Sequence, residues 1–132
     1  MKALAVSLGV AVCLSGCAMG IQKGADSPSV SYTVPRNYQT VYLRVQNQAG
    51  ECLRGKGHYD VYAEVDPAMQ TGLVAVRSPL GAEVARTEIK AVDARNTQVT
   101  HTVWGHSPWD GSALSAMRQS VMIDTSVCVA YK

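Results

Sequence analysis

The side chains of this chain best suited to hydrolytic chemistry lie in one loop, between Trp104 and Gly111. His106, Ser107 and Asp110 are the residue types of a hydrolase triad. Triad members must, however, project from separate elements to align on one substrate, and the sequence has no nucleophile elbow. Loop polarity and helix capping explain these side chains better. We therefore expect no catalytic residues and no enzymatic activity.

The histidines and carboxylates elsewhere do not form a second candidate site, either for a metal ion or for catalysis by paired carboxylates. A zinc site needs three or four converging ligands, and His58, His101 and His106 have no His or Cys partner at the usual short spacing. Asp60 and Glu64 share one face of an expected strand, about 13 Å apart. That separation exceeds what glycoside hydrolysis requires. We expect no metal and no cofactor.

Trp104 and Trp109 flank the same Gly-Pro loop and make it the most distinctive local feature. In one interpretation, one indole closes the open end of the core and the other anchors the loop. In the other, the loop is a binding tip, since exposed tryptophans are favoured binding anchors. Trp104, His106 and Trp109 are accordingly the candidate partner-binding residues.

The N-terminus has the layout of an export signal. Lys2 precedes an apolar run that ends in Leu14-Ser15-Gly16-Cys17, which gives a positive start, an apolar middle and small residues at the cut. The run is shorter than the roughly 20 residues of a membrane-spanning helix. We expect residues 1–16 to be removed as a signal peptide.

Leu14-Ser15-Gly16-Cys17 resembles the lipobox of small proteobacterial lipoproteins of unknown function. The resemblance implies acylation of Cys17, and two or three acyl chains would hold the protein stably on a membrane. The alternative is an ordinary secretory signal that leaves Cys17 as a free thiol. Ala18 stands where some inner-membrane lipoproteins have Asp, which favours the periplasmic face of the outer membrane.

Cys52 and Cys128 are the other two cysteines of the exported part. Two cysteines in an oxidising compartment predict one disulfide. The alternative is a pair of separate buried thiols.

The charge balance excludes one class of partner. Twelve Lys and Arg stand against ten Asp and Glu, without the basic patch that nucleic-acid binding requires. The expected partners are the membrane, through acyl chains on Cys17, and an envelope protein.

The mature chain divides into a tether and one domain. Residues 17–34 are poor in apolar side chains and predict a flexible tether. Residues 35–132 predict a single domain facing the periplasm. Its first segment carries apolar residues at helical spacing from Tyr38 to Cys52, and Ser112 is expected to cap a second helix with Leu114, Met117, Val121 and Met122 on one stripe.

Four segments between the two helices alternate apolar and polar residues, as half-buried strands do. They cover residues 58–65, 73–77, 83–92 and 97–104. Short connections predict an antiparallel meander. We expect an α+β domain of two layers, with a four-stranded sheet and an N-terminal and a C-terminal helix on one face. This layout resembles the helix-grip domains of lipoproteins in the outer-membrane protein assembly complex, and the resemblance is one of fold alone.

Two functions fit these expectations. The first is a non-enzymatic, membrane-anchored lipoprotein that binds a protein partner through the Trp109 loop or an exposed sheet edge. The second is a binder of a small apolar or glycan ligand between sheet and helices, suggested by Tyr38, Tyr42, Tyr59 and the methionines of the second helix.

Overall fold

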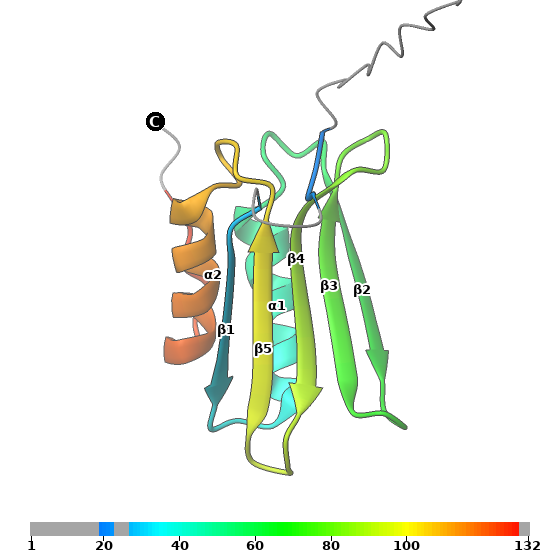
Figure 1. Ribbon diagram of the computed structural model, residues 1–132, viewed down its shortest axis with the longest axis vertical. Coiled ribbons are helices and arrows are strands. Elements are labelled where there is room, and N and C mark those ends of the chain that lie inside the picture. The colour runs from blue at the N-terminus through cyan, green and yellow to red at the C-terminus, as the bar shows by residue number, and fades with distance from the viewer. Residues whose placement is uncertain (1–18, 23–26, 130–132) are drawn as a thin grey trace, which may run out of the picture.

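The computed structural model describes residues 19–22 and 27–129 as one antiparallel sheet with two helices on one face (Figure 1). The elements in chain order are β1 (Ser29–Val34), α1 (Tyr38–Cys52), β2 (Asp60–Asp66), β3 (Thr71–Arg77), β4 (Glu83–Ala91), β5 (Thr97–Val103) and α2 (Gly111–Ile123). Helix α1 packs on β2, β3 and β4, and α2 packs on β1 and β5. The expected α+β class is confirmed. None of the helices in the described ranges is long and apolar enough to cross a membrane.

The expectation of four strands is wrong, because the sheet has five in the order β1-β5-β4-β3-β2. The additional strand is β1, Ser29–Val34, which the sequence analysis assigned to the tether. Its alternate residues are Ser and Thr because they lie on the outer face of the sheet rather than in the core. Ser29 and Ser31 place their hydroxyls 3.1 and 2.7 Å from those of Thr102 and Thr100 on β5.

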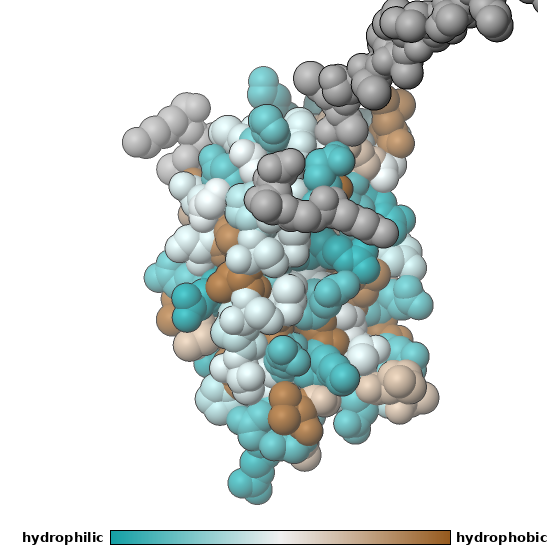
Figure 2. Space-filling view, viewed as in Figure 1, coloured by the Kyte–Doolittle hydropathy of each residue, from teal (hydrophilic) through white to brown (hydrophobic). Residues whose placement is uncertain are grey.

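The outer face of the sheet is polar, and Figure 2 shows it as mostly teal and white with scattered brown side chains. On β4, Arg86 and Glu88 point to this face, as the alternation predicted. Arg86 donates to both carboxylate oxygens of Glu83 at 3.0 Å. Arg77 of β3 lies over the ring of Tyr62 on β2, 4.2 Å from its centroid.

Helix α1 buries the face that carries its apolar residues. Asn37 caps it by accepting a hydrogen bond from the Gln39 backbone N–H at 2.9 Å. The expected apolar positions from Tyr38 to Cys52 are buried, apart from half-buried Tyr42. Gln48, a polar residue of the same helix, is 1 % exposed. Its side-chain amide donates to the backbone carbonyl of Val127 at 3.2 Å.

Helix α2 differs from expectation at both ends. Asp110, not Ser112, is the N-cap, because its carboxylate accepts from the backbone N–H groups of Ser112 and Ala113. Met122, expected in the apolar stripe, is 45 % exposed. The helix ends at Asp124, whose carboxylate lies 3.3 Å from the Nε of Arg44 on α1.

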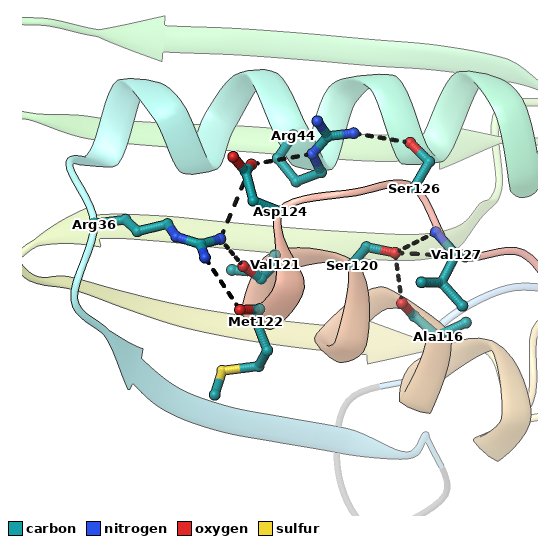
Figure 3. Close-up of polar contacts among 9 residues, drawn as sticks. All are labelled: Arg36, Arg44, Ala116, Ser120, Val121, Met122, Asp124, Ser126 and Val127. Carbon is teal, nitrogen blue, oxygen red and sulfur yellow. Dashed lines mark hydrogen bonds and ion pairs between the residues drawn. The ribbon is translucent and has the colours of Figure 1, made fainter.

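After α2 the chain turns back along the two helices (Figure 3). Arg36 donates to the carbonyls of Val121 and Met122 at the end of α2. Ser120 donates to the carbonyl of Ala116 at 2.7 Å and accepts from the backbone N–H of Val127 at 2.9 Å. These contacts direct the C-terminal segment toward the end of α1.

The returning segment brings Cys128 to Cys52. Their Cα atoms lie 4.9 Å apart and their sulfurs lie at disulfide distance, the arrangement that the expected pairing requires. The cross-link joins the last residue of α1 to the C-terminal segment.

Candidate functional site

Three connections meet at one end of the domain, which we call the loop end. The sheet register pairs Ala85 of β4 with Val103 of β5, and Asp60 of β2 with Arg77 of β3. The loop before β2 (residues 53–59), the β3–β4 turn (residues 78–82) and the loop after β5 (residues 104–110) therefore share this end, which is uppermost in Figure 1.

Trp109 joins two of these loops and is only 5 % exposed. Its indole Nε1 donates to the carbonyl of Leu53 at 2.8 Å. Its ring stacks on Tyr59, with centroids 4.3 Å apart. A side chain at Gly55, which has a φ of +55°, would begin 3.4 Å from the Trp109 ring. This indole closes the end of the core, so it is not an exposed binding anchor.

Trp104 and His106 lie beside it. Trp104 is half-buried with its ring centroid 6.5 Å from that of Trp109, and the exposed His106 ring packs 4.5 Å from Trp104. The backbone N–H of Trp109 donates to the backbone carbonyl of His106 at 2.8 Å. This hydrogen bond closes a turn that contains the cis peptide bond Ser107–Pro108. The structure thus brings the three candidate residues together, but only His106 is freely exposed.

A pocket of about 820 Å³ lies between the 53–59 loop and the start of α2. We call it the end pocket, and its lining consists of Cys52, Gly55, Lys56, His58, Tyr59, Ser107, Pro108, Trp109, Asp110, Ser112, Ala113 and Val129. The Trp109 side was predictable from the sequence, whereas Lys56 and His58 were not recognised as lining residues, and Tyr59 was expected to line a gap between sheet and helices instead. Gly55 and Gly57, which both have positive φ, were the sequence signal that this loop has a defined backbone conformation.

In the part of the chain that the structure describes, His106, Ser107 and Asp110 do not form a catalytic triad. The Asp110 carboxylate is engaged by the start of α2. Among residues 19–22 and 27–129, no hydrogen bond joins His106 to Ser107 or Asp110, and no group of three His, Cys, Asp or Glu side chains could hold a metal ion. Asp60 and Glu64 are both exposed on β2, and Glu64 accepts from the Tyr62 hydroxyl at 2.7 Å.

The third histidine is inside the core. His101 is fully buried, with its Nε2 2.6 Å from the Tyr32 hydroxyl and its Nδ1 2.8 Å from the Thr87 hydroxyl. Burial lowers the pKa of His101 from 6.5 to about 4, so the ring is neutral at neutral pH. Burial also raises the pKa of Tyr32, while the nearby Arg118 opposes that shift. The hydroxyls of Tyr32 and Thr87 satisfy both ring nitrogens, which is a structural role.

Cys17 and the rest of Leu14-Ser15-Gly16-Cys17 lie outside the described residues. No protein-family model matches the chain, and no curated protein matches it.

Proposed function

We propose that this protein is a non-enzymatic lipoprotein of the bacterial envelope, anchored through acylated Cys17 at the periplasmic face of the outer membrane. We propose further that it binds an apolar segment of a protein partner in the end pocket. The anchor is supported by the sequence Leu14-Ser15-Gly16-Cys17 after an apolar segment. Partner binding is supported by one observation above all, the end pocket of about 820 Å³. Pockets that hold small molecules measure about 300–1,000 Å³, so the end pocket has room for one or two apolar side chains of a bound segment.

The lining of the end pocket indicates what it would hold. Tyr59, Pro108 and Ala113 give it apolar walls, and such walls take an aliphatic or aromatic side chain. The exposed side chains of Lys56 and His58 at one side offer hydrogen bonds to the backbone or an acidic group of the bound segment.

The alternative, a small ligand held between sheet and helices, has less support. The void between α1, α2, β3 and β4 measures about 10 Å³, and a single water needs at least that much. Tyr38 is buried core, and Tyr42 and Tyr59 pack against the core. We therefore propose the end pocket as the binding site.

The test uses positions on α2 that keep the fold intact. Trp109→Ala would confuse binding with folding, because Trp109 holds the loops together. Ser112 is exposed and lines the end pocket, whereas Ser115, one turn on, is equally exposed and lies outside it. A photo-crosslinking amino acid at either position, introduced in cells that make the full chain, samples the two surfaces separately.

We expect position 112 to capture one envelope protein through an apolar segment, and position 115 not to capture it. Ser112→Trp, which places a large ring at the wall of the end pocket, should reduce partner capture from a second pocket position, Lys56, while Ser115→Trp preserves it. Capture of the same proteins from positions 112 and 115, or capture unaffected by Ser112→Trp, would contradict the proposed site.

A further inference from the structure

The segment nearest the proposed anchor is fixed to the loop end of the domain. The backbone N–H of Ile21 donates to the carbonyl of Glu83, the first residue of β4, at 2.8 Å. Gly20 is buried with a φ of +107°, and a Cβ atom there would lie 2.8 Å from the same carbonyl and 3.2 Å from the Cβ of Ala82. Only glycine therefore fits at this contact.

This contact leaves little free chain before the anchor. Cys17 precedes Gly20 by three residues, and three extended residues span at most about 11 Å. The headgroup region of one leaflet is about 5–8 Å thick. An acylated Cys17 would thus hold the loop end close to the bilayer surface, without the long tether that the sequence predicted.

An exposed apolar side chain lies at the same corner. Leu80, in the β3–β4 turn, is 96 % exposed. The turn is well defined, since Ser78 donates its backbone N–H to the Ala82 carbonyl and accepts from the Gly81 N–H, both at 2.8 Å. Ala82 is also the residue whose Cβ approaches Gly20. Met19, 37 % exposed, adjoins the same contact.

We propose that the loop end is a membrane-seating surface, with Leu80 inserted between the lipid headgroups while Gly20 fixes the domain against the anchor. This inference rests on the proposed acylation of Cys17. The domain then has one orientation on the membrane, and the end pocket, at the same end of the domain, opens near the bilayer surface. Its partner would be a protein that presents its apolar segment there.

The opposite end of the domain provides a matched control. Met69, in the β2–β3 turn, is 70 % exposed and lies at the far end of the sheet from Leu80. The full-length lipoprotein, extracted from membranes with Cys52 and Cys128 oxidised, can carry one cysteine-attached environment-sensitive dye at position 80 or 69. Each protein is reconstituted on vesicles of phosphatidylethanolamine and phosphatidylglycerol, some of them containing nitroxide-labelled lipid.

We expect the dye at position 80 to shift its emission to shorter wavelength and to be quenched by nitroxide lipid, while the dye at 69 behaves as in water. Gly20→Val should reduce quenching at position 80 without releasing the protein from the vesicles. A protein that floats with the vesicles but shows equal, water-like emission from both positions would refute insertion of the loop end into the headgroup region. The proposed anchor would not be affected by that result. A protein that does not float would overturn both.

Discussion

Acidification should weaken this fold through one buried side chain, His101. In the folded protein its pKa is lowered by burial from 6.5 to about 4. Between these two values the unfolded chain binds a proton that the folded protein does not, so stability falls as the pH is lowered through this window. From about pH 7.5 to about pH 5, a shift of this size removes about 2 kcal/mol from the free energy of unfolding.

The assay is urea unfolding of the oxidised domain at both pH values, followed by the fluorescence of Trp104 and buried Trp109. A loss of about 2 kcal/mol lowers the urea midpoint by about 1 M. The control is His101→Gln, whose amide offers one donor and one acceptor to the hydroxyls of Tyr32 and Thr87 but does not titrate.

His101→Gln should be somewhat less stable than the natural protein at neutral pH and should lose much less stability on acidification. The difference between the two proteins isolates His101, because both share every other titrating group. Equal losses in the two proteins would show that protonation of His101 does not cause the acid sensitivity.

Three further predictions concern the loop end. Replacing Cys52 and Cys128 by Ala opens a cross-link with a sequence separation of 76 residues and should cost about 4 to 5 kcal/mol on a chain-entropy basis, measured by urea unfolding; a stability change near zero would contradict a closed disulfide. Trp109→Phe leaves the buried carbonyl of Leu53 without its donor and should cost about 2 kcal/mol in the same assay, whereas an unchanged midpoint would mean that the contact is absent. Asp110→Ala removes the α2 cap and should cost about 1 kcal/mol, while Asp110→Asn should retain most of that stability; equal losses would exclude capping.

The helices and strands β2 to β5 were predictable because their sequence signals come from burial. The apolar residues of α1 recur at helical spacing, and Ala85, Thr87 and Ile89 on β4 alternate with charged residues. Both periodicities reflect one face packed in the core. The fold class followed from the order of these elements.

Edge strand β1 carries the same local signal, and its assignment to the tether was an error of interpretation. Val30, Tyr32 and Val34 are half-buried or buried and alternate with Ser29, Ser31 and Thr33 on the open side of the sheet. The polar residues just before this segment have the composition of a linker, and the assignment extended that composition into the strand. The local pattern does not give the partner of β1, which is β5, about seventy residues later.

The candidate site was only half predictable. The loop from Trp104 to Gly111 stood out by its residue types, but the two interpretations of Trp109 could not be separated without knowing that Leu53 and Tyr59 lie against it. The cap of α2 was misplaced by two residues because Asp110 and Ser112 are both good N-caps. The end pocket arises from two loops that are distant in sequence.

The anchor at Cys17 is the claim on which both the partner site and the membrane seating depend. Its most direct test is the intact mass of the protein extracted from membranes, before and after reduction and thiol alkylation. We expect a chain that begins at Cys17 and carries acyl groups, with no alkylated thiol until reduction exposes Cys52 and Cys128. An unacylated chain, or thiols that react before reduction, would contradict it.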